Sequence, residues 1–82
     1  MKSILVTGGC GYIGSTLIDN LLKYNKYKIY CIDNFENSNQ SVYKFLKRKN
    51  CKIFKFDLRD SNKVQKIILK FNIDCCIHLA AI

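Results

Sequence analysis

Residues 7–14 read TGGCGYIG, and this stretch decides the fold of the chain. It follows a short apolar run at 3–6 (SILV) and precedes a segment in which apolar residues recur at helical spacing. A strand, a glycine-rich loop and a helix in this order form the pyrophosphate cradle of a dinucleotide-binding fold. The sequence therefore predicts a nucleotide site close to the N-terminus.

The glycines of this loop are expected to serve different purposes. Gly8 allows the chain to turn sharply off the strand, and Gly11 has no Cβ, so that a phosphate can approach the backbone. Gly14 allows the helix to pack closely on the sheet. The backbone N–H groups of Tyr12 and Ile13, in the first helical turn, would then face the pyrophosphate at the positive end of the helix dipole.

An acidic residue follows at the distance that such a site requires. Residues 28–33 (KIYCID) read as a second strand, and Asp33 ends it about 20 residues after Gly14. A carboxylate there accepts hydrogen bonds from the adenosine ribose and repels the 2′-phosphate of NADP. Because residues 34–43 contain no Lys or Arg to offset this repulsion, the sequence favours NAD as the cofactor.

The rest of the chain alternates between strand-like and amphipathic segments, without a repeat or linker that would mark a domain boundary. We expect strands at 3–6, 28–33, 52–57 and 75–80, and helices at 12–24, at 42–49 and from 60–61 onward. The residues expected to face the core are Ile13, Leu17, Ile18, Leu21 and Leu22 in the first helix, Val42, Phe45 and Leu46 in the second, and Val64, Ile67, Ile68 and Phe71 in the third. The predicted fold class is α/β: residues 1–82 form the N-terminal half of a Rossmann fold, with about four parallel strands in the order 3-2-1-4 and three helices.

The composition argues against several other functions. The net charge is +8, but the lysines are spread over helix faces without interleaved aromatic residues, so we expect no nucleic-acid partner. No apolar run is long enough to span a membrane, and we expect no membrane partner. Five cysteines without C-x-x-C spacing predict neither a metal site nor a disulfide framework and fit the reducing cytoplasm. The adjacent Cys75 and Cys76 are expected on opposite faces of a strand.

Four motifs carry a resemblance to a known family. They are TGGCGYIGS at 7–15, DNFENS at 33–38, DLRD at 57–60 and Asp74 with IHLAA at 77–81. With them the chain resembles the N-terminal part of the extended short-chain dehydrogenases/reductases, the NAD-dependent epimerase/dehydratase family, and most closely the UDP-glucose 4-epimerases. The resemblance covers essentially the whole chain but only about the first quarter of such an enzyme.

The resemblance implies a set of NAD contacts. The implied contacts are Gly8, Gly11, Tyr12, Ile13 and Gly14 around the pyrophosphate, Asp33, Asn34, Asn37 and Ser38 at the adenosine ribose, Asp57 and Leu58 at the adenine, and Leu79, Ala80 and Ala81 beneath the ribose-phosphate. For Asp57 a second role weighs equally: Asp57 and Asp60 are both placed to cap the third helix.

The resemblance also implies that catalysis lies elsewhere. In this family a Ser or Thr and a Tyr-x-x-x-Lys pair, from elements after the fourth strand, act on the sugar 4-hydroxyl. Two literal matches, Tyr24 with Lys28 and Tyr43 with Lys47, are interpreted as coincidental, because their expected positions are far from any nicotinamide. His78, inside an expected buried strand, is interpreted as a packed, hydrogen-bonded residue. We therefore predict no catalytic residue within these 82 residues.

The favoured function is the NAD-binding segment of a UDP-glucose/UDP-galactose 4-epimerase of galactose metabolism, a cytoplasmic isomerase, with this segment inactive alone. A UDP-sugar would bind only to the full-length protein, whose relatives are expected to form homodimers. Two alternatives remain open: a stand-alone, non-catalytic dinucleotide-binding module, and a segment of another NAD-dependent sugar-nucleotide epimerase or dehydratase. A basic nucleic-acid-binding protein on a degenerate scaffold is disfavoured.

Overall fold

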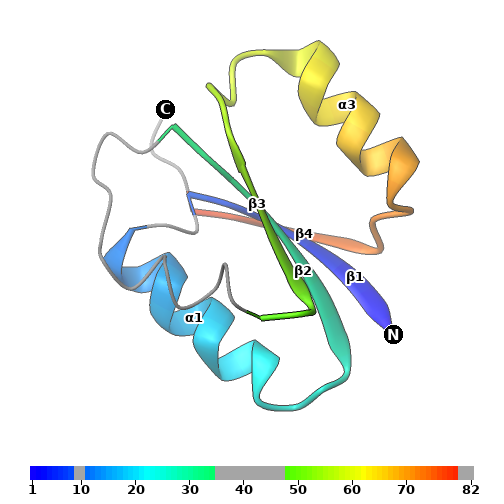
Figure 1. The fold of residues 1–82 in the computed structure, drawn as a ribbon. Coiled ribbons are helices and arrows are strands. Elements are labelled where there is room, and N and C mark those ends of the chain that lie inside the picture. The colour runs from blue at the N-terminus through cyan, green and yellow to red at the C-terminus, as the bar shows by residue number, and fades with distance from the viewer. Residues whose placement is uncertain (9–10, 35–47, 80–82) are drawn as a thin grey trace.

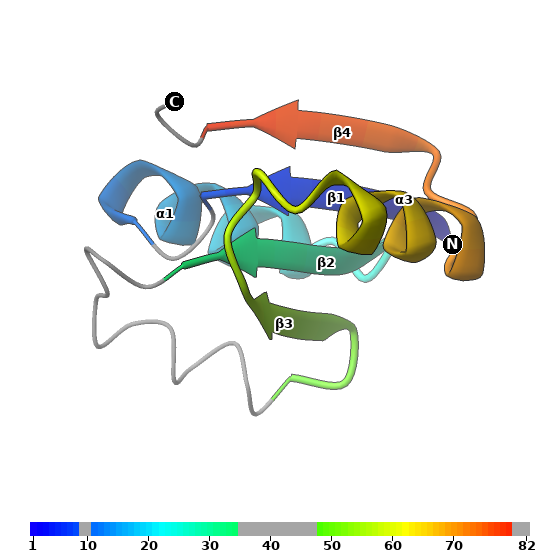
Figure 2. The same ribbon diagram turned by 90° about the horizontal axis from the view of Figure 1, so that it is seen from above.

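A computed structural model describes residues 1–8, 11–34 and 48–79, which form a parallel sheet with a helix on each face (Figures 1 and 2). The strands are β1 (Lys2–Thr7), β2 (Tyr27–Asp33), β3 (Cys51–Lys55) and β4 (Cys75–His78), and the helices are α1 (Tyr12–Leu22) and α3 (Ser61–Lys70). The strand order is β3-β2-β1-β4, with every neighbouring pair parallel. This confirms the predicted fold class and strand order. The predicted helix at 42–49 falls mostly outside the described residues, and its last two positions, 48 and 49, are not helical.

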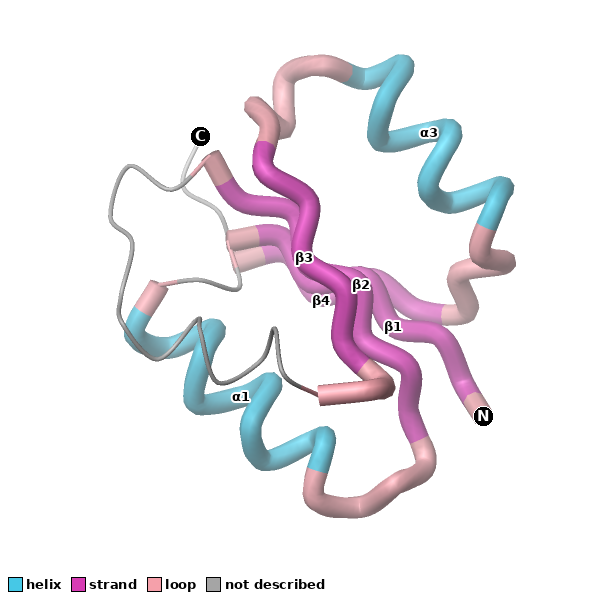
Figure 3. Tube along the Cα trace, in the orientation of Figure 1, coloured by secondary structure: helices cyan, strands magenta, loops and turns pink. Residues whose placement is uncertain are grey.

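The two faces of the sheet bury two separate apolar clusters. Alternate residues of a strand point to opposite faces, so neighbours in sequence belong to different clusters. The cluster on the α1 face contains Ile4, Val6, Ile18, Leu22, Ile29, Cys31 and Cys51. The cluster on the α3 face contains Leu5, Tyr30, Ile32 and Ile67. Figure 3 shows α1 and α3 on opposite sides of the strands, as these clusters require.

Helix α1 begins at Tyr12 as predicted, but its C-terminal end and the burial of its first turn differ from the prediction. It ends at Leu22 rather than Tyr24, because the next three N–H groups bond to carbonyls three residues back and Asn25 adopts a left-handed φ of 54°. Ile13 was expected in the core but is 72% exposed. It lies in the first turn, just after the glycine loop, whereas the buried Ile18 and Leu22 lie further along the helix against the strands.

Helix α3 packs through a narrower stripe than expected. Ile67 is buried, and Phe71, directly after the helix, stacks on Tyr30 with ring centroids 4.4 Å apart. Val64 also packs against this cluster. The expectation for Ile68 was wrong, since its side chain is 39% exposed. One residue turns a helix by about 100°, which moves Ile68 to the margin of the stripe defined by Ile67.

Strand β4 is an edge of the described sheet, which corrects the expectation that it is a buried strand. The strand runs over Cys75–His78, is paired on one side with β1, and has only Ile77 half-buried. Cys75 and Cys76 lie opposite Ile4 and Leu5, residues of different faces, so their predicted alternation is confirmed although both are exposed. His78 is exposed, not part of a buried strand.

Strand β3 also ends earlier than predicted, at Lys55 rather than residue 57. Phe56 still donates its N–H to the Asp33 carbonyl at 3.2 Å, after which a turn closes between the Asp57 carbonyl and the Asp60 N–H at 2.9 Å. Across the described ranges, no helix is both long and apolar enough to cross a membrane.

Candidate functional site

The predicted contact residues that the structure describes gather at the carboxyl edge of the sheet. The N–H of Gly8 donates to the Ile32 carbonyl at 2.8 Å, which fixes the start of the glycine loop beside Asp33. The N–H of Phe56 in turn donates to the Asp33 carbonyl at 3.2 Å. The ends of β1, β2 and β3 are therefore joined, and the carboxyl edge of parallel strands is where α/β folds bind ligands.

The backbone conformation favours glycine at Gly8 but not at Gly11. Gly8 has a φ of 73°, in the left-handed region that glycine adopts without strain. Gly11 has φ −75° and ψ 177°, a conformation open to any residue, and it donates its N–H to the Gly8 carbonyl at 3.3 Å. A Cβ on Gly11 would meet that carbonyl oxygen at 3.6 Å, which is ordinary contact. Backbone strain and the described packing do not demand a glycine at 11, whereas close approach of a ligand would.

The start of α1 is suited to an anion. Gly11 is the N-cap, so the helix begins without a side-chain cap, and its first turn holds no acidic residue. The first N–H groups and the positive end of the helix dipole are thus available near Tyr12 and Ile13. Gly14 is buried, in line with its predicted place against the sheet. These features fit a pyrophosphate.

Asp33 lies at the end of β2, half-buried, directly after the residue that accepts the Gly8 hydrogen bond. This places Asp33 beside the start of the loop predicted to hold the pyrophosphate, as a ribose contact requires. Asn34 is exposed beside it. Asn37 and Ser38, predicted at the same ribose, lie outside the described residues.

The Asp57 side chain lies in a turn fastened by Arg59. Its Oδ1 accepts a hydrogen bond from the Arg59 backbone N–H at 2.9 Å, and its Oδ2 accepts one from the Arg59 Nη2 at 2.7 Å. The Arg59 Nε lies 3.1 Å from both carboxylate oxygens. These side-chain and backbone hydrogen bonds lower the pKa of Asp57 to about 2, so the carboxylate is ionised at neutral pH.

Asp60 caps α3, so Asp57 does not have the capping role that was weighed against its contact with adenine. The Asp60 Oδ1 accepts a hydrogen bond from the Lys63 N–H at 3.3 Å. Asp57 bonds to Arg59 instead, and its predicted contact with adenine stays a prediction. Leu58, the second predicted adenine contact, is half-buried and packs against the cluster on the α3 face.

The end of β4 joins the same edge from the other side. The N–H of Leu79 donates to the Thr7 carbonyl at 2.9 Å, and the Leu79 side chain is 39% exposed. His78 Nδ1 is hydrogen-bonded to the Thr7 Oγ1 at 2.6 Å, which confirms the hydrogen bond expected for this histidine. No partner for His78 was predicted from the sequence, although parallel pairing of these strands places Thr7 opposite it. Ala80 and Ala81 lie outside the described residues.

Comparison with known proteins identifies the family of this chain. The sequence model of a family described as GDP-mannose 4,6 dehydratase matches residues 5–82. The chain belongs to this family. It is therefore a member of the NAD-dependent epimerases and dehydratases, as the resemblance predicted.

Relatives of this family member include both epimerases and dehydratases. It is 43% identical to the bifunctional protein gal10 of Schizosaccharomyces pombe, over 96% of this chain and 11% of that protein. It is 34% identical to the UDP-glucose 4-epimerase GEPI48 of Cyamopsis tetragonoloba, over 99% of this chain and 25% of that enzyme. The structure of dTDP-glucose 4,6-dehydratase from Bacillus anthracis, in complex with NAD, superposes with a TM-score of 0.92 at 27% identity, over 100% of this chain and 27% of that one. The chain thus spans about a tenth to a quarter of these relatives' lengths.

In this member of the family, the Tyr-x-x-x-Lys match that the structure describes, Tyr24 with Lys28, lies away from the described site. Tyr24 follows the C-terminal end of α1, at the amino edge of the sheet, and is 66% exposed. Tyr43 and Lys47 lie outside the described residues. Among residues 1–8, 11–34 and 48–79, no group of His, Cys, Asp or Glu is arranged to hold a metal ion.

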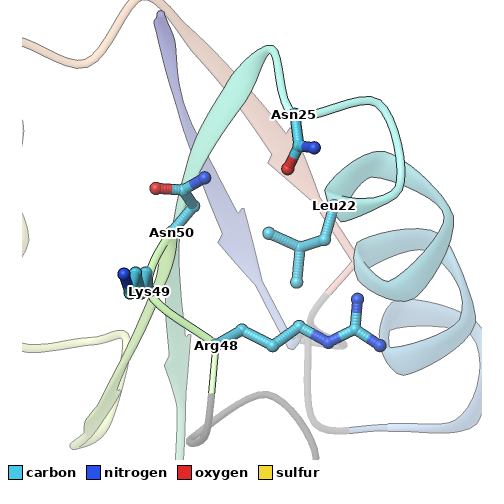
Figure 4. Close-up of a pocket in the computed structure, with 5 residues that line it drawn as sticks. All are labelled: Leu22, Asn25, Arg48, Lys49 and Asn50. Atoms are coloured by element: carbon cyan, nitrogen blue, oxygen red, sulfur yellow. The ribbon is translucent and has the colours of Figure 1, made fainter.

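A hollow of about 400 Å³ lies at the opposite edge of the sheet from the glycine loop (Figure 4). It is lined by Leu22, Asn25, Arg48, Lys49 and Asn50. In Figure 4 the Arg48 side chain extends toward α1, where its Nη2 pairs with the Asp19 carboxylate at 2.7 Å. The hollow therefore lies between the end of α1 and the start of β3, away from the residues predicted to bind a dinucleotide.

Proposed function

We propose that this chain is the NAD-binding segment of a sugar-nucleotide 4-epimerase that interconverts UDP-glucose and UDP-galactose. The observation that carries the proposal is Gly11, a glycine that neither strain nor described packing requires, at the uncapped start of α1. A pyrophosphate approaching the backbone there explains the missing Cβ. The NAD bound by the Bacillus anthracis dehydratase supports the choice of dinucleotide.

In this proposal the residues of the chain bind and orient the cofactor. Gly8 and Gly11 shape the loop, the N–H groups of Tyr12 and Ile13 hold the pyrophosphate, and Asp33 accepts hydrogen bonds from the adenosine ribose. When bound, NAD supplies a hydride acceptor and donor for the sugar C4. The proton transfer at the 4-hydroxyl belongs to residues outside this segment.

The choice of a 4-epimerase rests on two further observations. The DNFENS stretch at 33–38 matches the pattern typical of the 4-epimerases, and the relatives include a UDP-glucose 4-epimerase and gal10 proteins. A second candidate is a 4,6-dehydratase, which the family match and the Bacillus anthracis structure favour. Both candidates use the same NAD site, so the substrate distinguishes them. Among the described residues, Cys31, Cys51, Cys75 and Cys76 form no disulfide, which supports a reducing compartment such as the cytoplasm.

The cofactor choice is tested by replacing the ribose carboxylate. Asp33→Ala should weaken NAD binding by about 1–3 kcal/mol, the cost of losing hydrogen bonds to a charged acceptor. It should also relax discrimination against NADP, because the like charge is gone. Isothermal titration with both dinucleotides measures the two effects. Asp19→Ala removes the same charge at the other end of α1 and should change neither; equal titrations of wild type and Asp33→Ala would remove Asp33 from the site.

The inactivity of the segment is tested by direct assay. The purified 82-residue chain, supplied with NAD and UDP-galactose, should form no UDP-glucose above a Gly11→Val control, because no described residue offers a base at the 4-hydroxyl. Product analysis by chromatography gives the rate. Turnover clearly above the control would show that the segment carries its own catalytic group.

A further inference from the structure

The amino edge of the sheet, opposite the predicted NAD site, carries an excess of cations. The segments that lead into β1, β2 and β3 place basic residues there: Lys2, Lys23, Lys26, Arg48 and Lys49. By contrast, Asp33, Asp57 and Asp60 follow strands at the carboxyl edge. The amino edge therefore attracts anions.

The hollow of about 400 Å³ lies at this edge, and its volume is within the range of small-molecule sites (Figure 4). Its apolar part is Leu22, whose side chain is buried against the strands. Figure 4 shows the Asn25 amide and the Arg48 side chain on opposite sides of Leu22. Asn50 is held at the start of β3, because its carbonyl accepts a hydrogen bond from the Ile29 N–H at 2.7 Å. The hollow thus combines one apolar contact with polar side chains from the end of α1 and the start of β3.

Two of these polar residues are held in place by the fold. The Arg48 Nη2 donates to the Asp19 Oδ1 at 2.7 Å, which orients the guanidinium and leaves its other N–H donors for a further acceptor. Asn25 has a left-handed φ of 54°, and its N–H donates to the Leu22 carbonyl at 3.3 Å. Groups that are ordered before a ligand arrives bind it at a lower entropic cost.

The chemistry of the lining favours a phosphate that carries hydroxyl groups. The planar guanidinium of Arg48 matches the oxygens of a phosphate, and Lys49 adds a second positive charge. The carboxamides of Asn25 and Asn50 each offer a donor and an acceptor, which is what a hydroxyl group requires. The described lining holds no aromatic ring on which a nucleobase could stack, whereas Leu22 can contact the C–H groups of a sugar ring.

We propose that this hollow binds a small phosphorylated polyol of the sugar monophosphate class. Arg48 holds the phosphate, the two carboxamides bind hydroxyl groups, and Leu22 contacts the carbon skeleton. The site goes beyond the proposed NAD-binding function and does not depend on it, because the two sites lie at opposite edges of the sheet.

The test titrates the ¹⁵N-labelled 82-residue chain with glucose 6-phosphate, inorganic phosphate and glucose, followed by NMR. Glucose 6-phosphate should shift the side-chain amide resonances of Asn25 and Asn50 in a saturable manner. Inorganic phosphate should bind about tenfold more weakly, the scale of the hydrogen bonds that it cannot make, and glucose should give no saturable shift.

Two substitutions separate the phosphate contact from the hydroxyl contact. Arg48→Gln should weaken the binding of both phosphates at least about tenfold, the scale of hydrogen bonds to a charged group. If Arg48→Gln does not fold, Arg48→Lys keeps the charge without the planar fork and should also weaken both. Asn25→Gly keeps the left-handed backbone without strain and should bring the dissociation constants for glucose 6-phosphate and inorganic phosphate closer together.

The matched control is Arg59→Gln, the same substitution at the carboxyl edge, which should bind glucose 6-phosphate like wild type. Three outcomes would overturn the inference: no saturable shift at Asn25 and Asn50, equal weakening by Arg59→Gln, or shifts spread evenly over the lysines, as non-specific attraction of anions produces. Gly11→Val should lose NAD binding and keep the binding of glucose 6-phosphate, so failure of one site is distinguishable from failure of the other.

Discussion

At the scale of single residues, the glycine loop shows two different reasons for the same residue type. Gly8 needs its left-handed φ of 73° whatever binds to the chain. Gly11 has an extended backbone, and the nearest described atom leaves room for a Cβ at 3.6 Å. The backbone conformation therefore explains the first glycine. For the second, close approach of a phosphate stays a prediction from the spacing of the motif.

The two aspartates after β3 could not be assigned from the sequence in the same way. Asp57 and Asp60 both precede the third helix at positions from which a carboxylate can cap it. The assignment depends on the local competition for donors, in which Arg59 holds Asp57 and the Lys63 N–H reaches Asp60. The two aspartates are only three positions apart, and neither composition nor periodicity encodes which of them meets the Lys63 N–H.

The ionised Asp57 gives the stability a defined pH dependence. Because folding lowers the pKa of Asp57 from 3.8 to about 2, its contribution is present above the unfolded pKa and is lost as the pH falls through that window. Arg59→Gln should therefore be less stable than wild type at neutral pH, and the difference should shrink below about pH 4 and vanish only below about pH 2. Urea denaturation midpoints at several pH values measure this; a difference independent of pH would contradict it.

At the scale of elements, helical periodicity predicted the buried stripes better than their ends. Ile18 and Leu22 in α1 and Ile67 in α3 are buried as expected. Ile13 and Ile68 share the same spacing but are exposed, because one precedes the part of α1 that packs on the strands and the other lies at the margin of its stripe. Periodicity gives the direction of a side chain, but not whether another element lies beneath it.

The start of α3 depends on the Asp60 cap. Asp60→Ala should destabilise the chain by about 1 kcal/mol, because the Lys63 N–H loses its acceptor. Asp60→Asn keeps an oxygen acceptor and should recover most of this loss. Urea denaturation of the three proteins gives the free energies of unfolding. If Asn were as costly as Ala, the 3.9 Å ion pair with the Lys63 ammonium, rather than the cap, would be responsible.

At the scale of the whole molecule, the alternation of strands and helices was sufficient to predict the parallel sheet and its order. Handedness and parallel pairing leave few arrangements for such a chain, and β3-β2-β1-β4 is the simplest. That order brings the ends of four strands to one edge, so that residues predicted from separate motifs meet there. The site is a consequence of the topology more than of any single motif.

Contacts between distant parts of the chain were beyond the reach of the sequence. Thr7 and His78 are 71 positions apart, and Asp19 and Arg48 are 29 apart, so each pair is set by strand register and helix placement. The exposure of β4 has the same origin, since an apolar run reads alike in a central strand and at an edge. For residues 35–47, the second helix and two of the ribose contacts remain predictions.

We propose that Gly11 lies open for the pyrophosphate of NAD, and titration of the Gly11→Val variant with NAD tests this proposal. We expect saturable NAD binding by wild type and none by the variant, whose far-UV circular dichroism should remain of the mixed α/β type. Asn20→Val places the same side chain on the exposed face of α1 and should bind NAD like wild type. If Gly11→Val bound NAD as tightly as Asn20→Val, the pyrophosphate would not lie against Gly11.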